Sequence, residues 1–576
     1  MSDTLMLILR RMRRPLIVII TVLSISVFGL AHMPGMDAHG NPATLGYFHA
    51  LYIVSYTATT IGYGEVPYPF SEAQRAWVIF SIYLSVTTWA YAVGSILHMM
   101  RDPAFRAAMA RNQFNSRVRR LEEPFILIVG YGQSGMLLAR MLDRIGWRTV
   151  IVEVRPERAG RADLEEYVRA PIVLAADGRL PEVLVNAGVT SRMCQVMVVL
   201  SGNDETVQSV AVSGTILNPG LRIIARVTAP IATENLDPFP RIETVNAFES
   251  FASNIGLDLG SPEKLRIEEW LTGLPGSARP DILGLPMGHW IICGFGRFGY
   301  YASLALEKAG ATWTAIDDNP AIKDHPNLLR RTYSREALHE AGIDRAVGLL
   351  VGTDQDPINL AAVNRARQIN PKLFIAIRQT HAMNASLIEA ARADVRFIQA
   401  DVISHEVRQL ITSPLLNRFL TAVRADTGDL VERTGAALEA AAGDSVPFLW
   451  VLSCMTSYPG LREALSPDAD PPLTIADFLT HPNNASQLLS ATPLLMLRGR
   501  EQIFLPSPET VLKAGDKLLF AGSWDAEQLQ RQYLYSPSPP QAMRKGIEPP
   551  RSWLFRQLAK RRARTLATNE KRVRPI

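Results

Sequence analysis

Three apolar segments stand out near the start of the chain. Residues 15–33 are almost wholly apolar, and residues 76–100 form a second apolar run. A helix of about 20 apolar residues crosses a hydrocarbon core of about 30 Å, so each run predicts a membrane-spanning helix. Residues 43–59 are apolar but interrupted. This pattern favours a re-entrant helix, surrounded by protein, between the two spans.

From residue 124 onward, short apolar runs alternate with helical patterns. Residues 124–129 predict a strand, residues 136–145 a helix and residues 149–152 a second strand. The same order returns with strands at 290–293 and 313–316. Strands that alternate with helices are typical of a parallel sheet covered by helices. The sequence therefore predicts α/β, Rossmann-like domains after the membrane part.

The pattern changes again in the last third of the chain. Residues 446–452, 492–498 and 517–522 predict strands of a mixed α+β lobe. Residues 536–576 begin Pro-rich and end basic, which favours a disordered tail; the alternative is an amphipathic helix that contacts anionic lipid or nucleic acid. The predicted division is a pore domain 1–100, a linker 101–123, an α/β domain 124–280, a second α/β domain 281–422, a C-terminal lobe 423–535 and a tail 536–576.

Charge orients the predicted spans. The chain has 60 Lys and Arg against 55 Asp and Glu, but basic residues gather before the first span and after the second. Both ends of the pore domain are therefore predicted to be cytoplasmic. A cleavable signal peptide is the rival interpretation of the first span, but no small-residue cleavage site follows it. The three cysteines, Cys194, Cys293 and Cys454, indicate no disulfide framework and are expected to be buried and inert.

A short extended run, Thr60 to Gly64, follows the re-entrant segment. Gly62 and Gly64 permit backbone angles that a side chain would forbid, so several carbonyls and the Thr60 hydroxyl can turn inward. Four copies around an axis would stack rings of oxygen atoms that replace the water shell of a potassium ion. Two spans and one re-entrant loop leave the pore open unless copies close it, so a homotetramer in membrane lipid is predicted.

The sequence Thr60-Ile61-Gly62-Tyr63-Gly64 resembles the selectivity filter of potassium channels, with Ile61 in place of the usual valine. The resemblance implies that these five residues bind K⁺ as it passes. The chain departs from the family pattern at Glu65, where aspartate is usual, and at Tyr56, where some relatives carry an acid behind the filter. Filter stability or inactivation is therefore expected to differ. The gating hinge of the second span is expected near Ser85 or at Gly94.

A glycine-rich motif follows the first strand of each α/β domain. Its members are Gly130, Tyr131, Gly132, Gln133, Ser134 and Gly135 in the first domain, and Gly294, Gly296, Arg297 and Gly299 in the second. Such glycines suit a tight turn and close approach to a phosphate at a helix N-terminus. The following strand ends at Glu153 in the first domain and at Asp317-Asp318 in the second, and an acid there can hold ribose hydroxyls.

The two domains are copies of one unit. Asn218-Pro219 and Ser261-Pro262 recur 152 residues later as Asn370-Pro371 and Ser413-Pro414. A repeat this long decides the architecture. It resembles the tandem RCK (regulator of K⁺ conductance) domains of two-transmembrane bacterial potassium channels, of the GsuK type. The resemblance implies a gating ring that responds to a nucleotide such as NAD, NADH or ADP, a bacterial inner membrane location, and no nucleic-acid partner.

The copies are unequal. The glycine motifs lie 164 residues apart but the later landmarks 152 apart, so the second copy lacks about twelve residues after its second strand. In the first copy this region includes an apolar strand that ends at Asp177-Gly178, and its acid can face a nucleotide. The first copy is therefore the favoured dinucleotide site. The second takes a smaller nucleotide, or its glycines only pack helix against sheet. Arg155 and Arg297 are candidate phosphate contacts.

Calcium is a further candidate ligand, through loop acids such as Glu463, Asp468 and Asp470, although no EF-hand spacing exists and solvated acids are favoured. Two other functions compete with that of a ligand-gated potassium channel. A membrane-tethered NAD-dependent oxidoreductase lacks a recognisable catalytic constellation, because the histidines are scattered. A regulatory subunit of a potassium transporter leaves the filter sequence without a role. The sequence favours the channel, and no enzyme activity is expected.

Overall fold

The computed structural model describes residues 3–37, 39, 41–65, 69–466, 469, 471–482 and 484–535. The chain divides into two compact units. One unit comprises Met1–Leu127 and Arg148–Cys194, and the other Ile128–Trp147 and Gln195–Ile576. The Pro-rich basic tail predicted for residues 536–576, and the candidate acids Asp468 and Asp470, lie outside the described residues.

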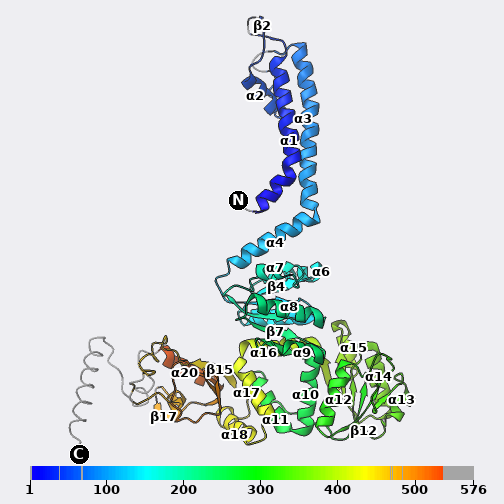
Figure 1. The fold of residues 1–576 in the computed structure, drawn as a ribbon, viewed down its shortest axis with the longest axis vertical. Helices are drawn as coiled ribbons and strands as arrows, with labels where there is room; N and C mark the ends of the chain where they lie inside the picture. The colour runs from blue at the N-terminus through cyan, green and yellow to red at the C-terminus, as the bar shows by residue number, and fades with distance from the viewer. Residues whose placement is uncertain are drawn as a thin grey trace, which may run out of the picture. The chain divides into compact units, whose positions relative to one another are not determined.

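The membrane part has the three helices that the sequence predicts. They are α1 (Asp3–His32), α2 (Tyr47–Ala58) and α3 (Glu72–Arg101). In Figure 1, α2 is the short blue helix beside the two long ones. Met12–His32 and Glu72–Arg101 are long and apolar enough to cross a membrane. The short α2 begins four residues later than predicted, because residues 42–43 (β2) pair with residues 35–36 (β1) instead.

The second span starts earlier than its apolar pattern does. Ser71 and Gln74 form a reciprocal capping box at the first turn of α3, and this cap begins the helix before the apolar run. The predicted linker is also largely helical, as α4 (Pro103–Arg119). Asp102 caps α4 through its side chain, and Pro103 stands at the first helical position, where its missing N–H costs nothing.

Each glycine motif belongs to a six-stranded sheet. The first sheet has the strand order β5-β4-β3-β6-β7-β8 and the second β11-β10-β9-β12-β13-β14. The strands of the first are β3 (Phe125–Val129), β4 (Arg148–Glu153), β5 (Ile172–Ala175), β6 (Cys194–Val199), β7 (Arg222–Arg226) and β8 (Ile242–Val245). Those of the second are β9 (His289–Cys293), β10 (Thr312–Ile316), β11 (Leu328–Leu329), β12 (Ala346–Val351), β13 (Phe374–Gln379) and β14 (Val395–Ile398). Neighbouring strands of the second sheet run parallel.

Helices connect these strands, as a parallel sheet requires. In the first copy they are α5 (Gln133–Arg144), α6 (Pro156–Ala159), η1 (Gly160–Asp163), α7 (Pro181–Asn186), α8 (Asp204–Leu217) and α9 (Pro230–Leu236). In the second they are α12 (Arg297–Lys308), α13 (Arg335–Glu340), α14 (Asp356–Ile369), η2 (Ala382–Asn384) and α15 (Ala385–Ala390). The twelve-residue deletion leaves the second sheet with β11, only two residues long, at its edge.

A pair of helices closes each copy. The pairs are α10 (Ala247–Gly260) with α11 (Pro262–Thr272), and α16 (Gln399–Thr412) with α17 (Pro414–Ala425). The repeated Ser-Pro landmarks are the breaks between them, since Ser261 and Ser413 leave the helical conformation and proline starts the next helix. The phenylalanines Phe248, Phe251, Phe298 and Phe397 join α10, α12 and β14.

The C-terminal lobe contains a four-stranded antiparallel sheet in the order β15-β20-β18-β19. Its three predicted strands are confirmed as β15 (Phe448–Ser453), β18 (Ala491–Arg498) and β20 (Lys517–Gly522), and β19 (Glu501–Phe504) was missed. The remaining elements are α18 (Leu430–Ala442), α19 (Ile475–Leu479), β16 (Thr480–His481), β17 (Asn484–Leu488) and α20 (Trp524–Tyr535). Trp450, Phe478 and Phe520 lie in its apolar core.

Candidate functional sites: an ion filter and two glycine turns

The backbone of the predicted filter alternates in handedness. Thr60, Gly62 and Gly64 have positive φ values of 64°, 65° and 92°, and Ile61 and Tyr63 between them do not. Successive carbonyls of an extended strand point to opposite sides. An alternation of left- and right-handed residues instead gathers the amide groups on one side of the chain and the carbonyls on the other. The sequence of glycines at every second position fits this conformation.

Thr60 is the costly member of this alternation. Among the described residues, only Thr60, Arg392 and Leu505 have positive φ without being glycine. The left-handed region costs a residue with a side chain roughly 1–2 kcal/mol. Such strain persists where the surrounding structure enforces it, and it clusters at functional sites. A strained threonine next to two positive-φ glycines therefore marks this segment as a built site rather than a chance turn.

The pore helix fixes the direction of the carbonyls. The Tyr56 carbonyl accepts the amide N–H of Ile61 at 2.9 Å and that of Gly62 at 3.3 Å. In a trans peptide the C=O points opposite to the following N–H. The carbonyls of Thr60 and Ile61 therefore point away from the pore helix, on a face that is exposed in the single chain. One copy supplies one wall of an oxygen-lined path.

The outer end of the filter is tied by an ion pair. The Arg75 guanidinium donates from Nε and Nη2 to the two oxygens of Glu65, at 2.8 and 3.1 Å. One of these oxygens also accepts the Phe70 amide at 2.9 Å. Glu65, the departure from the usual aspartate, is long enough to reach the first turn of α3. The sequence located the acid but not its partner, because Arg75 lies ten positions further along the chain.

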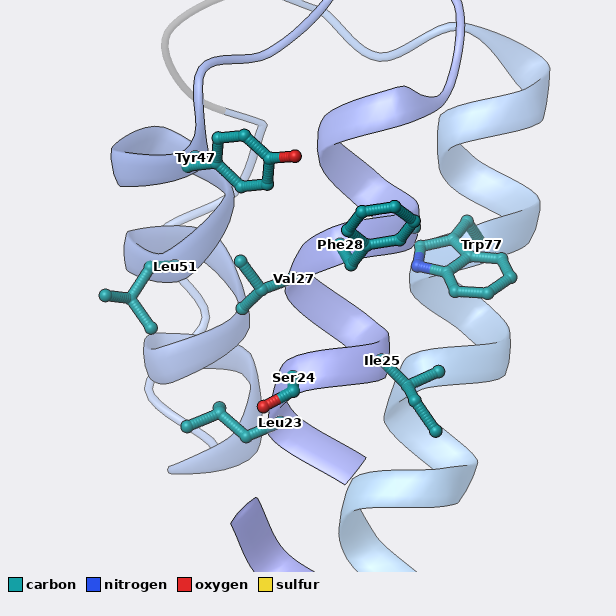
Figure 2. Close-up of a pocket in the computed structure, with 9 residues that line it drawn as sticks. Leu23, Ser24, Ile25, Val27, Phe28, Tyr47, Leu51 and Trp77 are labelled. Carbon is teal, nitrogen blue, oxygen red and sulfur yellow. The ribbon is translucent and has the colours of Figure 1, made fainter. Parts of the chain in front are cut away.

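Trp77 of α3 packs against α1. A Cβ at Gly29 would lie 2.0 Å from the Trp77 ring, so only glycine allows this contact between α1 and α3. The Trp77 indole N–H donates to the Ser26 carbonyl at 2.9 Å. Figure 2 shows Trp77 beside α1, at a pocket of about 590 Å³ that Tyr47 and Leu51 of α2 also line. Ser85 and Gly94, the two candidate hinges, both lie within the unbroken α3.

The first glycine turn has the geometry that its motif predicts. Gly130 has a φ of 106°, and a Cβ there would lie 3.0 Å from the Leu200 backbone. A Cβ at Gly135 would lie 2.2 Å from the Gly130 carbonyl oxygen, so α5 approaches the turn as closely as backbone allows. Tyr131 and Ser134 are buried and Gln133 is exposed. The Ser134 carbonyl accepts the Ser404 hydroxyl at 3.0 Å, which ties the turn to α16.

The second turn repeats this backbone. Gly294 has a φ of 97°, and a Cβ at Gly299 would lie 2.2 Å from the Gly294 carbonyl oxygen. Gly132 and Gly296 occupy the same position before α5 and α12, and neither N-terminus has a side-chain cap in the described structure. The first amide groups of both helices can therefore donate hydrogen bonds to a phosphate, and the helix dipole favours an anion at this end.

The acids that follow the turns differ in their partners. Both oxygens of Asp317 accept backbone amides, from Phe295 at 2.7 Å and from Asn319 at 2.9 Å. The neighbouring Asp318 is exposed. In the first copy, Glu153 is the last residue of β4, and one of its oxygens accepts the Arg155 amide at 2.9 Å. The Arg155 side chain is exposed.

Asp177 follows β5 and pairs with a neighbour in sequence. Its carboxylate accepts hydrogen bonds from the Arg179 guanidinium at 2.6–3.1 Å and from the Arg179 amide at 3.0 Å. These bonds hold the pKa of Asp177 below its ordinary value. The carboxylate is thus ionised at neutral pH, and Arg179 already forms hydrogen bonds to both of its oxygens.

Rings pack beside the second turn. Phe295, inside the glycine motif, stacks on Trp313 at a centroid distance of 5.4 Å, and Trp313 stacks on His325 at 4.9 Å. Arg330 ties the loop that carries His325 by donating to the Asn319 carbonyl at 2.5 Å and to Asp324. Sequence reasoning missed this cluster. Its only local signal is an aromatic residue in β10 where β4 has Thr149.

Three arginines from both copies share one region. Arg297, a candidate phosphate contact, donates to the Thr228 hydroxyl at 2.6 Å, just beyond the end of β7. Arg297 and Arg378 both lie over the Phe248 ring, at 5.9 and 5.2 Å from its centroid. Burial is the main cause that lowers the pKa of Arg226 and Arg378, and the charge of Arg297 lowers it further. Arg226 and Arg378 lie 152 residues apart, the repeat spacing, which is the signal that could have found them.

Neither a disulfide nor a metal cluster is found in the part of the chain that the structure describes. The three cysteines are free and buried, and burial raises the pKa of each thiol to about 12. The predicted burial of the thiols is confirmed. No group of three or more His, Cys, Asp or Glu side chains that could hold a metal ion occurs among the described residues.

Family models match four segments of the chain. Residues 16–102 match an ion channel family, residues 126–240 and 290–398 each match the TrkA-N domain, and residues 480–534 match the TrkA-C domain. In chain order, the segment similar to ion channels comes first, the two segments similar to TrkA-N follow, and the segment similar to TrkA-C comes last. The TrkA-N matches contain the two glycine turns, and the ion-channel match contains the filter.

Curated relatives match parts of this chain. Potassium channel protein 1 of Methanocaldococcus jannaschii is 25% identical over 255 residues, which cover 43% of this chain and 66% of that protein. The Trk system potassium uptake protein TrkA homolog of Pyrococcus abyssi is 33% identical over 106 residues, or 18% of this chain and 44% of that protein. The chain thus spans less than two thirds of either relative. Among solved structures, the GsuK channel matches with 17% identity and a TM-score of 0.47, over 92% of this chain and 99% of that one.

Proposed function

We propose that the chain is a subunit of a potassium-selective channel that a cytosolic nucleotide gates. The observation that carries this proposal is the alternating backbone of Thr60, Gly62 and Gly64 inside the ion-channel domain, with carbonyls turned away from the pore helix. A ring of such carbonyls replaces the hydration shell of K⁺. Backbone strain of this kind clusters at functional sites.

The pore requires several copies. Because the carbonyl face of one chain is exposed, a symmetric assembly of four must surround the ion, and we propose a homotetramer. Basic residues in the first half of α1 and after α3 support the proposal that both chain ends lie on the cytoplasmic side of a bacterial inner membrane. Membrane lipid is then the partner of the apolar faces of α1 and α3.

The ligand proposed is an adenine nucleotide such as NAD, NADH or ADP, bound at the first glycine turn. Gly130, Gly132 and the amide groups at the start of α5 would hold phosphate, and Glu153 a ribose hydroxyl. Arg226, Arg297 and Arg378 add positive charge from both copies, which suits a phosphate-bearing ligand. A nucleotide gates the pore only through different affinities for the open and closed states.

Calcium stays a prediction without a supporting group of described residues. The solved structures that resemble this chain include a GsuK channel bound to NAD and a GsuK bound to ADP. In both cases the nucleotide belongs to the relative. For this chain, these two ligands decide which nucleotides to test first.

The test is potassium flux from liposomes that hold the purified full-length protein. Barium-sensitive K⁺ flux that exceeds Na⁺ flux, and that changes when NAD, NADH, ADP or ATP is added alone, is the expected result. Flux that ignores every nucleotide would overturn the gating half of the proposal and leave the pore. Absence of flux together with consumption of NADH would contradict the channel function and support the oxidoreductase hypothesis.

A further inference from the structure

The carbonyl at the outer end of the filter faces the wrong way for an ion. The amides of Ile61 and Gly62 face the pore helix, so the carbonyls paired with them face the ion path. The Gly64 carbonyl does the reverse. It accepts a hydrogen bond of 2.5 Å from the Tyr56 hydroxyl, and Tyr56 is a buried residue of the pore helix behind the filter.

Tyr56 is held in place by neighbouring rings. Its ring meets Tyr52 at 5.3 Å and Tyr63, a filter residue, at 5.6 Å, both edge to face. Tyr56 thus contacts the filter through its carbonyl, its ring and its hydroxyl. Its backbone supports the inner part, and its side chain supports the outer part.

The acid that follows the filter does not take this hydroxyl. Arg75 binds both oxygens of Glu65, and the Phe70 amide binds one of them. Glu65 is thereby drawn toward α3, and the described hydrogen bond of the Tyr56 hydroxyl goes to the Gly64 carbonyl. While Arg75 holds Glu65, the Tyr56 hydroxyl binds the Gly64 carbonyl.

The Gly64 peptide has room to turn. Gly64 has a φ of 92°, and a Cβ placed on it would meet no atom within 4 Å. Glycine crosses between backbone regions that other residues do not. The carbonyl can therefore face either the Tyr56 hydroxyl or an ion.

We propose that Tyr56 is a positioning residue for ion binding, whose hydroxyl competes with K⁺ for the Gly64 carbonyl and so sets the affinity of the outermost ion site. This inference rests on the proposed channel function. With the site empty, the carbonyl stays on Tyr56. When K⁺ binds from outside, the peptide turns, the hydrogen bond breaks and the outermost oxygen ring forms.

The test measures the outermost site by itself. Ba²⁺ blocks a potassium filter, and external K⁺ that binds outside the Ba²⁺ slows its escape outward. The half-saturating external K⁺ for this slowing reports the affinity of the outermost site. Tyr56→Phe keeps the ring and removes the hydroxyl, so half-saturation should fall about fivefold, the change expected from losing one competing hydrogen bond.

Tyr52→Phe is the matched control. Tyr52 lies one turn earlier on α2, and its ring touches Tyr56, but no hydrogen bond of its hydroxyl is described, so half-saturation should stay at the wild-type value. A Tyr56→Phe value equal to wild type would overturn the proposal. So would an equal fall in both variants, because the Tyr52 hydroxyl has no described hydrogen bond to the Gly64 carbonyl.

A second substitution covers the case in which Tyr56→Phe does not conduct. Fluorotyrosine at position 56 makes the hydroxyl a stronger donor and should raise the half-saturating K⁺. A fall, or no change, would contradict the competition. Failure of the wild-type protein to conduct K⁺ at all is a different result, which would overturn the proposed channel function instead.

Discussion

The two glycine turns share a backbone but differ in what surrounds it. In both, a third glycine lets a helix approach a carbonyl oxygen where a Cβ would lie 2.2 Å away. In the second, Asp317 accepts two backbone amides and the rings of Phe295, Trp313 and His325 stack beside it. The first has Thr149 where the second has Trp313. A glycine motif thus reports close packing of helix on sheet, and ligand binding depends on the residues beside it.

The largest expected effect falls equally on both turns. Gly135→Ala and Gly299→Ala each push a Cβ against a carbonyl oxygen, and should destabilise their domain by about 2–3 kcal/mol, as overpacking does. Hydrogen exchange of the α5 and α12 amides in the full-length protein measures the loss locally. Gly202→Ala is the control, because no atom lies within 4 Å of its Cβ. A loss at only one turn would mean that the turns do not share a packing role.

The second-largest expected effect is a difference in nucleotide affinity between the two turns. Glu153→Gln removes a charged acceptor for a ribose hydroxyl and should weaken nucleotide binding about tenfold or more. Asp317→Asn should change the affinity less than twofold, because that carboxylate already serves the turn itself. Calorimetric titration of the full-length protein with NAD, NADH and ADP measures both. Equal losses would make the second turn a nucleotide site as well.

A smaller effect concerns Arg297. Arg297→Gln gives the second turn the residue that the first has at position 133, and removes the bond to Thr228. The expected loss is about 1 kcal/mol, seen as faster hydrogen exchange after β7. Arg155→Gln, at an exposed side chain, should leave this exchange unchanged. Unchanged exchange in Arg297→Gln would show that the bond adds nothing to the packing of the copies.

The smallest effect is a pH dependence confined to the first copy. Arg179 lowers the pKa of Asp177, so the pair stabilises the folded state above the ordinary pKa of about 3.9, and this stability disappears as pH falls through the lowered value. Arg179→Gln should raise the pKa of Asp177 and cost less than about 1 kcal/mol at pH 7, because the arginine is largely exposed. Carboxyl titration by NMR checks the shift. A pKa that does not rise would assign the lowering to the Arg179 amide alone.

Most of the fold could be predicted from local sequence patterns. Apolar length located α1 and α3, and the glycine motifs located both sheets, because spans and tight turns follow from consecutive residues. The filter was readable for the same reason. The bond from Tyr56 to Gly64, the pair of Glu65 with Arg75, the ring stack at Trp313 and the contact of Arg297 with Thr228 were not. Each joins side chains whose distance depends on turns and packing that one sequence does not determine.

The most direct measurement is the nucleotide response of K⁺ current in planar bilayers, with the two turns altered separately. Replacing Gly130 and Gly132 with valine should abolish the response while K⁺ over Na⁺ selectivity stays at the wild-type value. Replacing Gly294 and Gly296 in the same way should leave a nucleotide response, reduced only as far as the domain is destabilised. A full response in the first variant, or a response lost only in the second, would contradict gating through the first turn.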